Sequence, residues 1–271
     1  MSELDIIKQT KRVQTVNSLY QDLLALGIEE NDTLLVHSSL SKIGWVCGGA
    51  YAVCLALLKA VNKGSVVMPS QSSSNSDPLY WGNPPVPKEW LKDIYENMPA
   101  FDVSSVTTNM GTIAEQFRVL DGSIRSNHPK VSFCAHGCLS KEIISNHVLT
   151  PGFGLESPLG KLYEINNSKI LLLGVGYDKC TSFHLSEVLI QTLNKVKDGS
   201  SMLIDGVRQW VEFEDFDYDS TDFEALGKAF EEFGVVVQGQ VGQADCKLFD
   251  LKKAVDFAVC WLKENRNIKD V

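Results

Sequence analysis

The sequence contains no apolar run close to the roughly 18 to 20 residues that a membrane-spanning helix needs. Its first residues, MSELDIIKQTKRVQ, also lack the apolar h-region of a secretory signal peptide. Basic side chains are the minority, because 25 Lys and Arg residues stand against 34 Asp and Glu residues, for a net charge of -9. A nucleic-acid-binding surface requires clustered Lys and Arg. We therefore expect a cytoplasmic protein that binds neither membranes nor nucleic acid.

Cysteine pairs are not indicated either. The seven cysteines are an odd number and are spread from position 47 to position 260, which favours reduced thiols over a disulfide framework. We expect most of them in the core as small apolar residues. In the segment CAHGC, Cys134, His136 and Cys138 would share one face of a strand, as metal ligands could. No second ligand cluster of suitable spacing accompanies them, so we expect no metal.

Three signature loops of other enzyme classes are missing. The run VHSSLSKIGWVCGG lacks the Gly-Lys-Ser ending of a phosphate-binding P-loop. In GVGYDKC, Cys180 stands roughly where a dinucleotide fingerprint has its last glycine. A serine hydrolase that uses His184 is an open alternative, but no Gly-x-Ser-x-Gly elbow marks a nucleophile.

What the chain does contain is an alternation of apolar strands and helices. Its 271 residues, 44% of them hydrophobic, can fill the core of one large α/β domain or two small ones. No clear linker interrupts the chain, so we expect a single domain, residues 1–271, with a three-layer α/β fold. The expected strands are 33–36, 65–69, 131–135, 170–173 and 235–237, and the expected helices are 10–26, 50–61, 87–98, 111–120, 141–147, 221–233 (capped by Thr221) and 251–265.

Two segments depart from this alternation. Residues 201–214 alternate around Asp205-Gly206, a strong signal for a β-hairpin. Residues 70–87 form a long polar loop that carries Tyr80 and Trp81, and loops of this length are often functional. The acidic run 212–224 is either a solvated face or part of a site for a polycation.

The segment KILLLGVGYDKCTSFHLSE, residues 169–187, is the first candidate for a reaction site. A buried strand ends at Gly174, and a helix opens near Thr181 with His184 and Glu187 on one face. In open α/β sheets, ligands bind and react at the carboxyl ends of the strands. A helix N-terminus disfavours imidazolium, so His184 could serve as a neutral base. The alternative is a partly buried histidine beside a surface glutamate.

The loop VHSSLSKIGWVCGG is the second candidate, because small residues between a strand and a helix let backbone N–H groups approach an anion. Taken together, seven segments resemble the aminoglycoside 3-N-acetyltransferase family, in particular its chromosomal bacillus-type members. They are LLVHSSLSKIGWVCGG, VVMPSQS, DPLYWGNPPVP, TTNMGTIAEQFR, RSNHPKVSFCAHG, SPLGKLY and LLLGVGYDKCTSFHLSE, in the family's order within residues 33–188. The later segment VGQADCKLFDLKKAVDFA matches more loosely.

The resemblance implies a three-layer α/β/α fold with a central mixed sheet, unlike the GNAT fold, and an acetyl-CoA-dependent N-acetyltransferase. It places His184 as the essential histidine, Glu187 as its acidic partner and as a contact for a substrate ammonium, and Asp77 opposite the amino sugar. The residues that it assigns to the acetyl-CoA site are His37, Ser38, Ser39, Leu40 and Ser41 in the H-S-S-L segment, and Ser72, Thr108, Met110, Gly111 and Ser157 elsewhere.

We therefore expect His184 to deprotonate a small cationic amine, directly or through a water, so that it can attack the thioester. The resemblance favours the 3-amino group of a 2-deoxystreptamine aminoglycoside. A different small amine, or a CoA-binding protein without aminoglycoside activity, is the alternative. The loop 73–87 would select the substrate, and the sequence leaves open whether the protein is a monomer or a homodimer.

Overall fold

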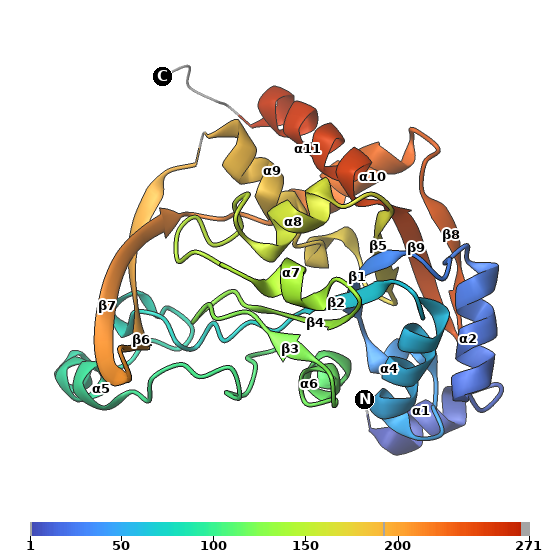
Figure 1. Cartoon of the computed structure of the whole chain (residues 1–271), viewed down its shortest axis with the longest axis horizontal. Coiled ribbons are helices and arrows are strands. Elements are labelled where there is room, and N and C mark those ends of the chain that lie inside the picture. Colours follow the sequence, from blue (N-terminus) through green and yellow to red (C-terminus); the bar gives the residue numbers. More distant parts are fainter. Residues whose placement is uncertain (1, 192, 267–271) are drawn as a thin grey trace.

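The computed structural model describes residues 2–191 and 193–266, and its centre is a seven-stranded mixed sheet (Figure 1). The strand order is β3-β4-β2-β1-β5-β9-β8, in which β2, β1 and β5 are parallel and the outer pairings are antiparallel. The strands are β1 (Thr33–Ser38), β2 (Ser65–Pro69), β3 (Ile124–Arg125), β4 (Phe133–Gly137), β5 (Ser168–Leu173), β8 (Val237–Val241) and β9 (Ala244–Asp250). The expected mixed sheet is confirmed.

Both faces of the central strands are buried, as the apolar runs in the sequence predict. In β1, Leu34 and Val36 join one core cluster, whereas Leu35 joins the cluster on the other face of the sheet. The first cluster is covered by α2 (Val16–Ala25), α4 (Gly49–Ala60) and α6 (Thr112–Arg118). The second is covered by α7 (Ser140–Ile144), α8 (Pro158–Glu164), α9 (Phe183–Ile190), α10 (Phe223–Glu231) and α11 (Leu251–Asn265). The three-layer expectation is therefore confirmed.

A long two-stranded ribbon stands apart from the sheet, at the left of Figure 1. It consists of β6 (Lys195–Ile204) and β7 (Val207–Phe216), which pair along their whole length. The turn residues Asp205 and Gly206 have φ angles of 51° and 76°, as a tight hairpin turn of this kind requires. The predicted hairpin is confirmed and is longer than the alternation in the sequence indicated.

The other elements follow the sequence with shifts at their ends. Helix α11 has the predicted bounds, but α10 begins one residue after Asp222, its N-cap, so the prediction of Thr221 as the cap is wrong. The predicted strand 235–237 lies instead at 237–241, where it pairs with β9, a strand that was not predicted. The remaining helical elements are α1 (Glu3–Gln9), α3 (Leu40–Ile43), α5 (Leu91–Asn97), η1 (Pro78–Tyr80), η2 (Lys88–Trp90) and η3 (Tyr177–Lys179).

Four of the seven cysteines are buried, which confirms that most of them belong to the core: Cys54, Cys134, Cys180 and Cys246. Within residues 2–191 and 193–266, no group of three or more His, Cys, Asp or Glu side chains is arranged to hold a metal ion. None of the helices in this part of the chain is both long enough and apolar enough to cross a bilayer.

Candidate active site

A cavity of about 390 Å³ lies beyond the carboxyl ends of the parallel strands β1, β2 and β5. It is the place where an open α/β sheet presents loops and helix N-termini to a ligand. The residues that line it are Val36, His37, Ser38, Ser39, Pro69, Gln71, Asn109, Met110, Gly111, Ala114, Val175, Asp178, Lys179, Cys180, Thr181, His184, Ser220 and Phe223. The two candidate segments of the sequence therefore meet in one cavity, as the parallel pairing of β1 with β5 requires.

The His184–Glu187 pair is formed inside the first turns of α9. Nδ1 of His184 lies 2.6 Å from Oε2 of Glu187. A carboxylate only accepts hydrogen bonds, so Nδ1 carries the proton and donates it, and Nε2 keeps its lone pair. The side chain of His184 lines the cavity and is 14% exposed, whereas Glu187 has no exposed surface. His184 is therefore in the tautomer whose Nε2 atom can accept a proton.

Three aromatic rings fix the plane of the imidazole. Phe153 stacks on His184 with a centroid distance of 4.9 Å and an interplanar angle of 14°. Phe223 and Tyr218 pack at 4.8 Å and 5.3 Å. Burial raises the pKa of Tyr218, whose hydroxyl donates to Asp215 and accepts from the backbone N–H of Phe153. Stacking and hydrogen bonding together leave the imidazole little freedom to rotate.

A second histidine lies in the same cavity. His37 is the fifth residue of β1, and its Nε2 lies 3.4 Å from Oγ1 of Thr181. Burial, and then the charge of His184, lower the pKa of His37 to about 3. His37 is therefore neutral at physiological pH and can only offer hydrogen bonds to a ligand.

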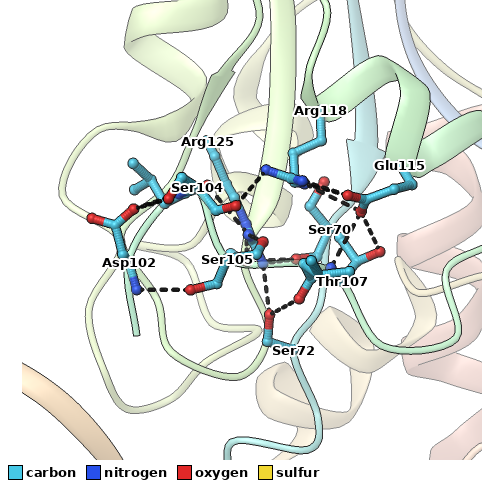
Figure 2. A network of polar contacts seen from close by, with 12 residues as sticks. Ser70, Ser72, Asp102, Ser104, Ser105, Thr107, Glu115, Arg118 and Arg125 are labelled. Atoms are coloured by element: carbon cyan, nitrogen blue, oxygen red, sulfur yellow. Dashed lines mark hydrogen bonds and ion pairs between the residues drawn. The ribbon is translucent and has the colours of Figure 1, made fainter. Parts of the chain in front are cut away.

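The segment that brings Met110 and Gly111 to the cavity is held by a buried arginine (Figure 2). Arg125, 7% exposed, donates to the carbonyl oxygens of Ser70, Val103 and Ser105 and to the hydroxyl of Ser72, which is 2.8 Å away. Burial lowers the pKa of Arg125 to about 10, so it stays charged at neutral pH. It thereby ties residues 102–107 to the end of β2.

A second charged pair completes this network. Arg118, on α6, pairs with Glu115, and the Glu115 carboxylate accepts hydrogen bonds from both the backbone and the hydroxyl of Thr107 (Figure 2). The chain then turns through Asn109 and Gly111, whose φ angles are 59° and 84°. Gly111 suits such a position because it has no side chain to clash in the left-handed region.

Five of the ten residues assigned to acetyl-CoA by resemblance line this cavity: His37, Ser38, Ser39, Met110 and Gly111. The other five lie outside its lining. Leu40 packs on the core, and Ser41 lies 3.3 Å from Ser39 through their hydroxyls. Ser72 belongs to the Arg125 network, Thr108 bonds to Ser74, and Ser157 is fully buried as the N-cap of α8.

Asp77 lies elsewhere, beside the β6–β7 ribbon. Its carboxylate accepts a hydrogen bond of 2.6 Å from the hydroxyl of Tyr95 and one of 2.9 Å from the N–H of Leu79. It borders two cavities of about 540 and 450 Å³. The charged residues that line them are Asp77, Lys130, Lys197, Asp198, Glu212, Glu214 and Asp217. Acidic groups therefore outnumber basic ones along this part of the ribbon.

Both carboxylate oxygens of Glu187 are bound by groups of the protein itself. Oε2 faces His184, and Oε1 accepts hydrogen bonds from Arg266 and from the N–H of Asp219. With both oxygens bound and no surface exposed, the carboxylate offers no contact to a substrate ammonium in this conformation. Only its role beside His184 agrees with the geometry.

Several residues around His184 were not identified from the sequence. Phe153, Tyr218 and Arg266 lie 31, 34 and 82 positions from it, and no local spacing connects them. Phe223 could have been recognised as a core residue from the amphipathic pattern of α10, but not as a neighbour of His184.

Comparisons with known proteins identify the family of the chain. A family model described as aminoglycoside 3-N-acetyltransferase matches residues 35–263. The chain is 45% identical over 269 residues to the SPbeta prophage-derived aminoglycoside N(3')-acetyltransferase-like protein YokD of Bacillus subtilis (strain 168), covering 97% of this chain and 98% of that protein. It is 31% identical over 281 residues to aminoglycoside N(3)-acetyltransferase VII of Streptomyces paromomycinus, covering 97% and 96%.

Solved structures extend the likeness to three dimensions. The crystal structure of YokD from Bacillus subtilis matches with a TM-score of 0.95 at 44% identity, covering 99% of this chain and 100% of that one. A structure described as AAC-IIIb binary with CoASH matches with a TM-score of 0.84 at 28% identity, covering 96% and 100%. The family model spans most of the chain, and the two relatives from Bacillus subtilis and Streptomyces paromomycinus span nearly all of it. The protein therefore belongs to the aminoglycoside 3-N-acetyltransferase family of acyltransferases.

Proposed function

We propose that the protein transfers the acetyl group of acetyl-CoA to the 3-amino group of a 2-deoxystreptamine aminoglycoside, with His184 as the general base. The observation that carries the proposal is His184, which is held by Glu187 and lines the same cavity as Ser38 and Ser39, beyond the ends of β1 and β5. The reaction would take place in the cytoplasm, where acetyl-CoA is available.

The chemistry requires a base because an ammonium group has no lone pair. Nε2 of His184 accepts the proton, and the neutral amine attacks the thioester carbonyl, so that a C–N bond forms as the C–S bond breaks. The attacking nitrogen loses its second proton as the amide forms, and the leaving thiolate of CoA takes up one proton to give the free thiol. Glu187 orients the imidazole and stabilises the imidazolium while it exists, as the acid of a His–Asp pair does in other acyl-transfer enzymes.

The cavity lining supports acetyl-CoA as the donor. His37 and Ser38 at the end of β1, Ser39 just after it, and Met110 and Gly111 from another segment line it. Hydroxyls, backbone N–H groups and a neutral imidazole can bind the amide groups of a pantetheine arm. A relative of the same fold has been solved with CoASH.

The acidic ribbon supports a polycationic acceptor. An aminoglycoside carries several ammonium groups, and carboxylates that line a concave surface attract them over a distance of about 10 Å at moderate salt. Asp77 and Glu212 line the ribbon cavities and would take this role, whereas the Asp198 carboxylate is already paired with Lys130. The names of the relatives also refer to aminoglycosides.

The test is a thiol-release assay with acetyl-CoA, a panel of aminoglycosides and a panel of simple amines. His184→Ala should lower kcat by about 10²- to 10⁴-fold, the contribution of a general base, and leave CoA binding intact. His136→Ala, on β4 and outside the cavity lining, is the matched control. Near-normal turnover in His184→Ala would refute the role of His184. Thiol release with simple amines alone would refute an aminoglycoside as the acceptor. Tight CoA binding without any thiol release would indicate a CoA-binding protein that is not an acetyltransferase.

A further inference from the structure

Arg266 binds the carboxylate partner of His184 from the side opposite the imidazole. Its Nη1 donates to Oε1 of Glu187. Its Nε and Nη2 donate to the two carboxylate oxygens of Asp222 at 2.7 and 2.6 Å, and Nη2 also donates to the carbonyl oxygen of Asp219 at 2.6 Å. One guanidinium therefore joins α9, the segment before α10 and the residue that follows α11.

The position of this charge matters because Glu187 is fully buried. A carboxylate without exposed surface and with only a neutral imidazole as partner would be costly to ionise. Arg266 places a positive charge against it, and although burial alone would lower the pKa of Arg266, the contacts with Asp222 and Glu187 raise it. The pair at the cavity is thus part of an Arg266–Glu187–His184 chain of hydrogen bonds.

We propose that Arg266 is a positioning residue for the general base: it fixes the Glu187 carboxylate against Nδ1 of His184, and its positive charge opposes the stabilisation of the imidazolium by Glu187. This inference rests on the proposed role of His184 as the base. The residues with titratable or charged side chains that face His184 or share its cavity are His37 on β1, Asp178 and Lys179 on η3, Cys180 after η3, Glu187 on α9, and Tyr218 and Asp219 before α10; Arg266 after α11 acts through Glu187.

The direction of the expected pH shift follows from the opposite charges of Glu187 and Arg266. Glu187 alone favours the imidazolium, which cannot accept the substrate proton. The positive charge of Arg266, bound to the far oxygen of the same carboxylate, offsets this effect. Removal of Arg266 therefore stabilises the imidazolium, and we expect the acid limb of kcat/KM to move to higher pH by about one unit.

The kinetic test compares Arg266→Gln, Arg266→Lys and Lys263→Gln over a range of pH. On the acid side, Arg266→Gln should lower kcat/KM about tenfold, since one unit on this limb is a factor of ten, and activity should recover at alkaline pH. Arg266→Lys keeps the charge and should lie between Arg266→Gln and the natural protein. Lys263→Gln removes an exposed charge from the last turn of α11 and should leave the profile unchanged. Equal loss of activity at every pH would overturn the proposal.

A second measurement does not depend on activity. The NMR titration of the His184 imidazole, identified by its loss in His184→Gln, should show a higher midpoint in Arg266→Gln than in the natural protein. If that variant does not fold, Glu187→Gln is compared with Glu187→Gln/Arg266→Gln, where loss of Arg266 should again raise the midpoint. An unmoved midpoint overturns the role of Arg266. A raised midpoint in a protein that acetylates no amine supports that role and refutes the proposed function.

Discussion

Two buried histidines outside the His184–Glu187 pair should make the protein sensitive to acid. His37 and His128 are 7% and 1% exposed. Burial lowers the pKa of both to about 3, helped by His184 for His37 and by His147 for His128. His128 lies 4.6 Å from His147 between ring centroids, and its Nδ1 accepts from the N–H groups of Lys130 and Val131. Both imidazoles are therefore folded into the protein in the neutral form.

The sign and size follow from the two pKa values. The unfolded chain binds protons near the ordinary value of about 6.5, whereas the folded protein does so only near 3. The stability contributed by neutral burial is thus fully present above about pH 6.5 and is lost as the pH falls toward the folded value. Each histidine loses about 1.4 kcal/mol per pH unit, or about 2 kcal/mol between pH 6.5 and 5. Together they remove about 4 kcal/mol of a total of about 5 to 15.

The assay is urea unfolding of the natural protein and of His128→Asn between pH 7.5 and 5. Asparagine can still accept the two N–H groups through its side-chain oxygen but does not titrate. The variant should be less stable at pH 7.5, yet lose about 2 kcal/mol less than the natural protein between pH 6.5 and 5. Each free energy comes from linear extrapolation. Parallel curves of stability against pH would refute the reasoning, because other titrating groups are common to both proteins.

Two further changes test the scaffold of the site. Arg125→Met removes the donor to Ser70, Ser72 and the 102–107 segment. We expect the free energy of unfolding to fall by about 3 kcal/mol and the KM for acetyl-CoA to rise. The control, Arg12→Met at an exposed position, should alter neither quantity. Unchanged melting and KM would contradict the role of the network. Gly227→Ala places a methyl group 1.9 Å from Cγ of Tyr177 and should destabilise by about 1 to 3 kcal/mol. The control in thermal melts is Gly82→Ala, whose added methyl group meets nothing within 4 Å. Equal melting temperatures of the two variants would show that α10 can shift away from Tyr177 without loss of stability.

The sequence predicted the parts of the fold that depend on local pattern. The runs that became β1, β2 and β5 are apolar on both faces, and the Asp205-Gly206 turn has few alternatives. β9 was missed although Ala244, Cys246 and Leu248 alternate with polar residues, so that signal was present in the sequence.

The site was also predictable only where its contacts are local in the sequence. His184 and Glu187 are one turn apart on a helix, so their contact can be predicted from spacing. Phe153 and Arg266 reach them through tertiary folding, which no spacing encodes. The acidic run is also more than a solvated face: the Asp222 carboxylate binds Arg266, and the Glu224 carboxylate accepts from the N–H of Tyr177.

The β6–β7 ribbon leaves the body of the molecule as a hairpin, and in the part of the chain that the structure describes its two strands form a sheet of their own. Under the proposed function, changes to the acidic residues of the ribbon that line the cavities beside Asp77 would alter acceptor binding without disturbing the strand that carries His37 or the helix that carries His184. Selection could then act on acceptor choice and on acyl transfer separately, which would give a protein with this function a short mutational path from one amine to another.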